Sequence, residues 1–391
     1  MTIKTLEDLG DLGGKTAVLR ADFNVPLKNG IIGDDTRIRA TVPTIKTLLE
    51  KGARVVILSH LGRPDGKPAP EYSLKPLVSR LSDLLGEDVG FTADCMDPPA
   101  GQKVVLMENL RFYAEEEEND RAFAERLAAH GDIFVNDAFS TAHRAHASTH
   151  ALAELMPAYA GHLMAEEIAA LNAALEEPER PVAAVVGGAK VSTKLDVLNH
   201  LIHKTDVLVL GGGMANTFLA AKGFAVGKSL HEPDMLDTAR KIMTAAHAAG
   251  CNIVLPEDVV VAAEFAENAP SETVTVDAIP ADKMALDIGE KSITHIISVL
   301  EDCKTVLWNG PMGAFEIPPF DKGTVKVAQY VAERTEDGTL TSIAGGGDTV
   351  AALAAAEVKD KFSYVSTAGG AFLEWIEGKI LPAIAALDKA A

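Results

Sequence analysis

Positively charged side chains in the N-terminal half of the chain recur beside the ends of expected strands. They are Arg37, His60, Arg63, Arg111 and Arg144, the last flanked by His143 and His146. Guanidinium groups bind phosphate and carboxylate oxygens in a bidentate geometry. A single arginine of this kind is more often a solvated surface residue. Five such groups on an acidic chain, however, indicate a focused anion pocket.

Acidic and amide side chains in the same half are of two kinds. Asp22 and Asn24 follow an apolar run, where short polar side chains can reach a ligand, although Asp22 could equally form a turn. The charge run Glu115–Glu118 is instead typical of a solvated loop or the start of a helix.

Glycine clusters in the C-terminal half occur where apolar runs end. They are Gly187-Gly188, Gly211-Gly212-Gly213, Gly345-Gly346-Gly347 and Gly369-Gly370. Ligands of open α/β sheets bind at the carboxyl ends of the strands, where glycine permits close approach and the next helix offers unpaired N–H groups to a phosphate. One cluster alone would more often mark a turn of the chain. Four in one half predict a phosphate site.

Two common nucleotide motifs are incomplete. Gly223–Ser229 resembles a P-loop, but three residues instead of four separate its glycines and a helical stretch precedes it, so we expect a surface turn. The G-x-G-x-x patterns that begin at Gly211 and Gly345 lack the final glycine of a nicotinamide-dinucleotide motif. The expected phosphate site belongs to neither type.

The elements that position these residues alternate between apolar runs of strand length and stretches with helical periodicity. Such alternation predicts parallel sheets with helices on both faces. The expected strands are Thr16–Arg20, Arg54–Ser59, Lys103–Met107, Asp132–Asn136, Val182–Gly187, Asp206–Gly211, Asn252–Pro256, Lys304–Asn309, Leu340–Gly345 and Phe362–Ser366. The expected fold is α/β, with two doubly wound, Rossmann-like lobes joined by a hinge.

The domain boundary is expected at the polar bridge 176–181, which follows a long helical stretch and precedes a new strand. This places one lobe at residues 1–175 and the other at 176–375.

The composition excludes several classes of protein. Among 391 residues, 36 Lys and Arg against 56 Asp and Glu give 36 − 56 = −20, which disfavours binding to nucleic acid or to anionic lipid. The three cysteines, Cys95, Cys251 and Cys303, are far apart and suggest neither a disulfide framework nor a zinc site. No signal peptide and no apolar run of membrane-spanning length is visible. We therefore expect a cytoplasmic protein.

The ordered set of motifs resembles the phosphoglycerate kinase family along nearly the whole chain. The resembling segments are Arg20–Pro26, Ser59–Gly66, Glu108–Phe112, Val135–His146, Gly187–Lys194, Gly211–Leu219, Trp308–Glu316 and Ala344–Thr349. The resemblance implies a hinged kinase in which the first lobe binds 3-phosphoglycerate and the second binds ATP or ADP with Mg²⁺, and closure of the hinge is expected. A phosphoryl group would pass between the nucleotide and the carboxylate, giving or consuming 1,3-bisphosphoglycerate.

The resemblance also implies roles for individual residues. Asp22 and Asn24 would orient the glycerate, and Arg37 would meet its carboxyl end. The substrate's remote phosphate would be held by His60, Arg63, Arg111 and Arg144. Lys194 would meet the transferring phosphoryl group, Glu316 the ribose, and Asp348 the metal. The remaining nucleotide contacts would be Gly211, Gly212, Asn309, Gly346, Gly347 and Thr349.

Further implications are a monomer and a C-terminal segment, residues 376–391, that returns to the first lobe. The family usually has glycine where Ser140 stands, and three consecutive glycines where this chain has Ala368-Gly369-Gly370. Two alternatives stay open on the residues alone. One is a two-domain NAD-dependent dehydrogenase, and the other is a non-catalytic two-lobed anion-binding protein.

Overall fold

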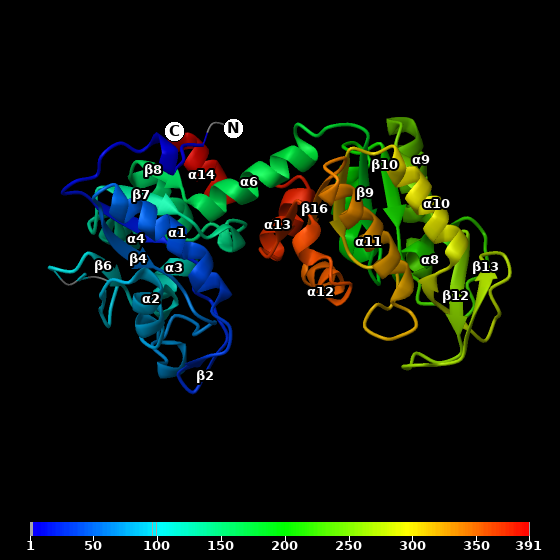
Figure 1. Ribbon diagram of the computed structural model, residues 1–391, viewed down its shortest axis with the longest axis horizontal. Helices are drawn as coiled ribbons and strands as arrows, with labels where there is room; N and C mark the ends of the chain where they lie inside the picture. The colour runs from blue at the N-terminus through cyan, green and yellow to red at the C-terminus, as the bar shows by residue number, and fades with distance from the viewer. Residues whose placement is uncertain (1–2, 96, 99, 391) are drawn as a thin grey trace. The chain divides into compact units, whose positions relative to one another are not determined.

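The computed structural model describes residues 3–95, 97–98 and 100–390, and its chain groups into two compact units (Figure 1). The first unit comprises Met1–Ile168 and Ile380–Ala391, and the second comprises Ala169–Lys379. The first transition falls within helix α6 (His162–Leu175), a few residues before the expected boundary at 175/176. The second falls between α13 (Gly370–Ile376) and α14 (Pro382–Ala390).

The first unit is built on a six-stranded parallel sheet. Its strands, in sheet order, are β5 (Val89–Phe91), β6 (Val104–Leu106), β4 (Arg54–Leu58), β1 (Thr16–Arg20), β7 (Ile133–Asn136) and β8 (Ala158–Ala160). Leu19 of β1 pairs with Ile57 on one side and Val135 on the other. The chain extends the sheet to one side of β1 and later to the other, so a crevice opens at the carboxyl ends of β1 and β7.

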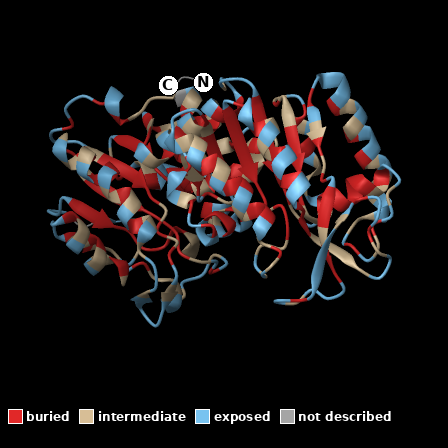
Figure 2. Ribbon diagram, turned by 45° about the vertical axis from the view of Figure 1, so that its right-hand side comes forward, coloured by how far each residue is buried: buried red, intermediate tan, exposed pale blue. Residues whose placement is uncertain are grey.

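Helices cover both faces of this sheet. Leu19 and its strand partners pack against Ile45 of α1 (Thr36–Glu50) and Leu81 of α2 (Leu77–Leu85). Side chains alternate between the faces of a strand, and the neighbouring Val18 is as fully buried as Leu19, so the opposite face is covered too. Figure 2 shows buried strands beneath helices that alternate between buried and exposed residues. Shorter helices complete the unit: α3 (Ala114–Glu117), α4 (Arg121–Ala128) and α5 (Leu152–Leu155).

The second unit repeats this plan. Its parallel strands, in sheet order, are β11 (Asn252–Val254), β10 (Val207–Leu210), β9 (Val182–Val186), β15 (Thr305–Asn309), β16 (Thr341–Gly345) and β17 (Tyr364–Ser366). The strand order reverses between β9 and β15. Its helices, besides α13, are α7 (Leu195–Leu201), α8 (Gly212–Ala221), α9 (Leu236–Ala249), α10 (Glu290–Glu301), α11 (Lys322–Glu336) and α12 (Gly347–Ala355).

All ten expected strands lie in these two parallel sheets, which confirms the predicted fold class. The sequence did not predict the edge strands β5 and β8, which have three residues each. Nor did it predict an antiparallel sheet in the second unit, formed by β13 (Ser271–Thr275), β12 (Asp258–Ala262) and β14 (Met284–Ile288). A short hairpin joins β2 (Leu27–Lys28) to β3 (Ile31–Ile32). Among the described residues, no helix is both long and apolar enough to cross a membrane.

Candidate active site

The crevice of the first unit brings together three segments that are distant in sequence. Asp22 lies just beyond β1, and its Oδ2 atom accepts hydrogen bonds from Arg37 Nη1 at 2.6 Å and from Ser140 Oγ at 2.5 Å. Arg37 comes from the first turn of α1, and Ser140 from the turn after β7. Ser140, at a position where the resemblance predicts glycine, therefore contributes a second donor to the carboxylate of Asp22.

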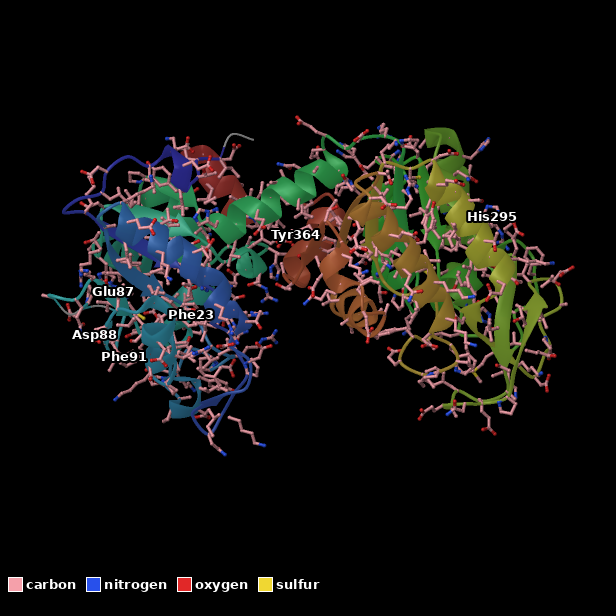
Figure 3. All side chains as sticks on the ribbon, in the orientation of Figure 1. Phe23, Glu87, Asp88, Phe91, His295 and Tyr364 are labelled. Atoms are coloured by element: carbon pink, nitrogen blue, oxygen red, sulfur yellow. The ribbon has the colours of Figure 1, made fainter. Side chains whose placement is uncertain are left out.

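Asn24 is held beside this pair by the backbone around it. Phe23, labelled in Figure 3, is fully buried and its N–H donates to Ser59 Oγ at 2.9 Å, which anchors the segment. The Oδ1 atom of Asn24 accepts the N–H of Gly62 at 2.9 Å. Asp22 and Asn24 flank this anchor on the alternate, half-buried positions.

Arg111 reaches the same region from a rigid turn. Buried Asn109 donates to the carbonyls of Leu61 at 2.7 Å and Tyr72 at 2.9 Å, and its Oδ1 accepts the N–H of Arg111. The Nη1 atom of Arg111 donates to Gly62 O at 2.8 Å. Its Nε atom is buried without a hydrogen bond, 3.4 Å from the carboxylate of Glu117.

The other arginines lie close enough to interact with Arg111. Burial lowers the pKa of Arg111, Glu117 and Glu116 oppose that shift, and Arg63 and Arg144 add to it. Arg63 and Arg144 are themselves exposed. The structure thus gathers the predicted cations into one cluster, with the exposed arginines free to approach an anion from solution.

His60 differs from the prediction, which counted it among the cations. Burial lowers its pKa well below the ordinary value, and the surrounding positive charges of Arg20, Arg111 and Arg37 lower it further. Burial likewise lowers the pKa of His146 to about 4. Both rings are therefore uncharged near neutral pH, and His60 contributes a hydrogen-bonding ring rather than a positive charge.

A buried ionic group beside His60 escaped the sequence analysis. Glu116, expected to be solvated within its charge run, is fully buried and accepts hydrogen bonds from Ser148 N at 2.9 Å and Ser148 Oγ at 2.6 Å. Arg20, also buried, donates from Nε to the same Oγ at 2.8 Å. The signal was weak because each partner is distant in sequence, although an arginine at the end of a buried strand is itself unusual.

In the second unit, Lys194 lies at the crevice between β9 and β15. It ends the 3-10 turn before α7, and its Nζ donates to Asn309 O at 3.0 Å and to Asn309 Oδ1. Asn309 is the last residue of β15, and its Nδ2 donates to Gly345 O at 2.7 Å. Burial lowers the pKa of Lys194 to about 8, while the carboxylate of Asp348 acts in the opposite direction. Asn309 therefore positions the lysine.

The glycines around this crevice allow the strand-end loops to approach closely. Gly211 donates its N–H to Val186 O at 3.1 Å, and Gly212 donates to Met312 O at 2.8 Å. A Cβ atom at Gly212 would lie 2.7 Å from Gly188 O. Because these N–H groups are used within the protein, Gly211 and Gly212 shape the site and do not offer free donors.

The start of helix α12, unlike those glycines, offers free backbone N–H groups. Gly346 precedes it with φ +98°, and no side chain caps its first turn. The first N–H groups of such a helix are available to a ligand, with the positive end of the helix dipole behind them. The hydroxyl of Thr349 is already engaged, because it accepts the N–H of Gly310 at 2.7 Å.

A cavity of about 370 Å³ lies against this edge, wholly within the second unit. Gly212, Gly213, Glu316 and Asp348 line it together with apolar side chains. Among these, Phe265 and Leu230 are 56% and 53% exposed, which leaves two large apolar surfaces for a flat ligand to cover.

Asp348 is suited to bind a divalent cation at this end of the sheet if the phosphates of a ligand supply the other oxygen atoms. Asp348 lines the cavity in the first turn of α12, where its carboxylate would repel a phosphate unless a cation lay between them. The described residues contain no group of three or more His, Cys, Asp or Glu side chains that could cage a metal. Mg²⁺ commonly uses one or two carboxylates together with substrate phosphates.

Comparisons with known proteins agree with this geometry. A family model described as phosphoglycerate kinase matches residues 6–379. The chain belongs to the phosphoglycerate kinase family. Phosphoglycerate kinases from Ruegeria sp. and Methylorubrum extorquens are 59% and 57% identical to it, each over 98% of this chain and 99% and 98% of theirs.

Solved phosphoglycerate kinase structures share the fold. The enzyme from Coxiella burnetii matches with a TM-score of 0.95 and 45% identity, and that from Pyrococcus horikoshii with 0.79 and 32%, each over 99% of both chains. The chain is thus a phosphotransferase of the phosphoglycerate kinase family. The dehydrogenase and non-catalytic binding-protein alternatives are not supported.

Proposed function

We propose that the first unit of this phosphoglycerate kinase binds 3-phosphoglycerate and that the second binds magnesium–ATP or magnesium–ADP. The observation that carries this assignment is the different chemistry of the two crevices. The first gathers arginines around the Asp22–Arg37 pair, which suits a small anion that carries a carboxylate, a phosphate and a hydroxyl group. The second combines a helix N-terminus and Lys194 with a cavity large enough for a nucleoside.

In the first unit, Asp22 and Asn24 would orient the glycerate, and Arg37 would meet the carboxylate that reacts. The phosphate that does not react would be held by His60, Arg63, Arg111 and Arg144. The exposed Arg63 and Arg144 would move onto it, while Arg111 and His60 are already fixed by protein contacts. Forked donors around a phosphate supply both affinity and orientation.

In the second unit, the N–H groups from Gly347 to Thr349 would bind nucleotide phosphates, with Gly346 allowing their approach. Asp348 would hold the magnesium ion, Glu316 would bind the ribose, and Gly211 and Gly212 would form the wall of the cavity. Asn309 would act through Lys194, whose ammonium group meets the phosphoryl group in transfer. The bound metal neutralises phosphate charge when present.

The chemistry needs positioning and charge stabilisation rather than a general base. Phosphoryl transfer passes through a loose transition state, and the attacking carboxylate is already ionised near neutral pH. The two substrates must meet away from water, because water would hydrolyse ATP or the acyl phosphate. We therefore include a hinge closure, driven by binding of both substrates, in the proposal.

The test is a coupled assay for ADP formed from ATP and 3-phosphoglycerate. Arg63→Ala should raise KM for 3-phosphoglycerate with a smaller fall in kcat, because the remote phosphate is bound in ground state and transition state alike. KM for ATP should change little. The assignment would be contradicted if the wild-type protein formed no ADP, or if Arg63→Ala raised only the KM for ATP. Family membership also supports a cytoplasmic location and a monomeric state. Size-exclusion chromatography with light scattering would test whether the protein is a monomer.

A further inference from the structure

Arg20 makes hydrogen bonds from three of its nitrogens inside the first unit, although it does not line the open part of the crevice. It is 1% exposed at the end of β1. Its Nη1 atom donates to Ala21 O at 2.5 Å, its Nε atom to Ser148 Oγ at 2.8 Å, and its Nη2 atom to His60 Nδ1 at 3.1 Å. These bonds fix the guanidinium plane against the imidazole ring.

The charge of Arg20 is balanced through Ser148. The Ser148 hydroxyl accepts from Arg20 and donates to Glu116 Oε1 at 2.6 Å, so one hydroxyl links a buried cation to a buried carboxylate. Burial opposes the charged form of each group, and the opposite charge of the other favours it. A buried ion of either sign needs such a partner. Glu116 thus anchors Arg20 in place.

The contact with Arg20 determines which nitrogen of His60 carries the proton. A guanidinium group has five N–H donors and no acceptor, so Nδ1 of His60 must accept and cannot itself be protonated. The proton of the neutral ring then resides on Nε2. Nε2 has no hydrogen-bond partner among the described residues. It also keeps some contact with solvent, so it is available to a ligand.

We propose that Arg20, anchored on Glu116 through Ser148, is a positioning residue that holds His60 as its Nε2–H tautomer, preset to donate a hydrogen bond to the substrate's non-reacting phosphate. The second half of this statement rests on the proposed function, which places that phosphate beside His60. The first half concerns the free enzyme alone.

A neutral donor suits this location. The charged groups that act on His60 are Arg20, Arg111 and Arg37, and a protonated ring would add a further positive charge and turn Nδ1–H toward the N–H of Arg20. The arginines supply the charge that the phosphate needs, and the histidine supplies a directed N–H. Without Arg20, His60 could adopt either tautomer, and one of the two presents no proton to the phosphate.

The tautomer can be read directly in the wild-type enzyme. Long-range ¹H–¹⁵N correlation spectra of the ¹⁵N-histidine-labelled protein distinguish a protonated from an unprotonated ring nitrogen, and His60→Gln identifies the His60 signals. We expect a single neutral form with the proton on Nε2 from pH 6 to 8. A proton on Nδ1, or a charged ring in that range, would overturn the proposal. This measurement needs no destabilising variant.

A double-mutant cycle tests whether Arg20 acts through His60. Arg20→Met should raise KM for 3-phosphoglycerate roughly tenfold, with KM for ATP changed less than about twofold. In a His60→Ala background the same substitution should have little further effect. Equal effects in both backgrounds would show that Arg20 does not act through His60 and would overturn the proposal. Arg121→Met, an exposed arginine on α4 paired with Glu125, is the matched control.

A milder variant and a rescue complete the test. Ser148→Ala removes the hydroxyl that links Arg20 to Glu116 and leaves both charged residues in place. Signals of both His60 tautomers should then appear in the spectrum. An unchanged spectrum would show that Glu116 does not anchor Arg20 through Ser148. His60→Gln keeps an amide N–H, so its KM for 3-phosphoglycerate should lie nearer to wild type than that of His60→Ala. If His60→Ala left this KM unchanged while the spectrum showed Nε2–H, the proposed phosphate contact would fail and the tautomer assignment would stand.

Discussion

The two units share one sheet plan, but the crevices at their strand ends are built differently. The crevice of the first unit is formed by side chains: Arg37 pairs with Asp22, and Arg111 reaches in from a turn that buried amides hold rigid. The crevice of the second is formed mainly by backbone, with a helix N-terminus, close-packed glycines and one lysine. In a site formed by side chains, single substitutions can remove the charges one by one. A site formed by backbone is altered by adding a Cβ atom at a glycine, or by removing the cation that would balance the phosphates of a bound nucleotide.

The largest expected effect comes from the two side chains assigned to the reacting groups, one in each unit. Arg37→Ala and Lys194→Ala should each lower kcat by about 10²–10³, because each would stabilise charge that develops as the phosphoryl group moves. Steady-state kinetics with thermal melts to exclude unfolding is the measurement. A near-normal kcat for Arg37→Ala, alongside a collapse of kcat for Arg63→Ala, would show that the reacting centre is misplaced.

The metal assignment gives the next largest effect. Asp348→Ala should weaken binding of magnesium–ATP by roughly ten- to hundredfold and leave metal-free ATP binding unchanged or slightly stronger, because the carboxylate repels bare phosphate. Calorimetric titrations with and without Mg²⁺ compare the two. Equal losses in both titrations would remove the metal role of Asp348.

Two adjacent glycines test the backbone character of the second site. Gly346 has φ +98° and a Cβ there would lie 2.7 Å from Asn309 Nδ2, whereas a Cβ at Gly347 would meet no heavy atom within 4 Å. Gly346→Ala should lower the free energy of unfolding by about 1–3 kcal/mol and raise KM for ATP, because strain displaces Asn309. Gly347→Ala should leave stability within about 0.5 kcal/mol of wild type. Chemical denaturation measures both, and indistinguishable curves would speak against the strained turn.

The pH dependence of the nucleotide side should follow Lys194. Burial lowers its pKa to about 8, so the ammonium form is lost as the pH rises through that value and kcat/KM for ATP should fall on the alkaline side. Lys194→Arg keeps its charge and should lack this decline, even if its overall rate is lower. The same alkaline profile in both enzymes would assign the titration to another group.

The smallest expected effect concerns Ser140, one of the two positions where the resemblance to the family predicts glycine. Ser140→Gly removes one of the two donors to Asp22 Oδ2, so KM for 3-phosphoglycerate should rise two- to fivefold while kcat and KM for ATP hold. Ser140→Thr, which retains a hydroxyl, should stay near wild type. A lower KM in the glycine variant would mean that the serine competes with the substrate for Asp22.

The fold could be predicted because parallel strands covered on both faces are continuous apolar runs. Thr16–Arg20 and Thr305–Asn309 are examples, and Gly310 marks the end of the second. The edge strand Val89–Phe91 was missed because its short run is interrupted by Gly90 and so carries too little apolar pattern. The antiparallel sheet was missed because Ser271–Thr275 is largely exposed and polar.

The site was predicted unevenly for a related reason. The type of a residue and its place near a strand end indicate what it can bind, and so pointed to Arg37, whereas Lys194 and Asp348 were implied only by the resemblance to the family. They do not show whether a charge is buried. Glu116 stands among exposed glutamates, and only its contacts with Ser148, 32 residues away, distinguish it from them. The neutral state of His60 likewise depends on its burial and then on Arg20, which is 40 residues away.

The return of the chain to the first unit has a consequence for biosynthesis. Helix α14 packs against α5 and β8, the second of which is labelled near it in Figure 1. The N–H of Ala383 donates to Ala142 O at 3.2 Å. Leu381, Ile384 and Leu387 are buried there. This covering segment is the last part of the chain to be translated, after the whole second unit. The N-terminal unit therefore exposes the apolar surface beneath α14 until synthesis of the chain is complete, even though the domains of a chain usually fold in N-to-C order.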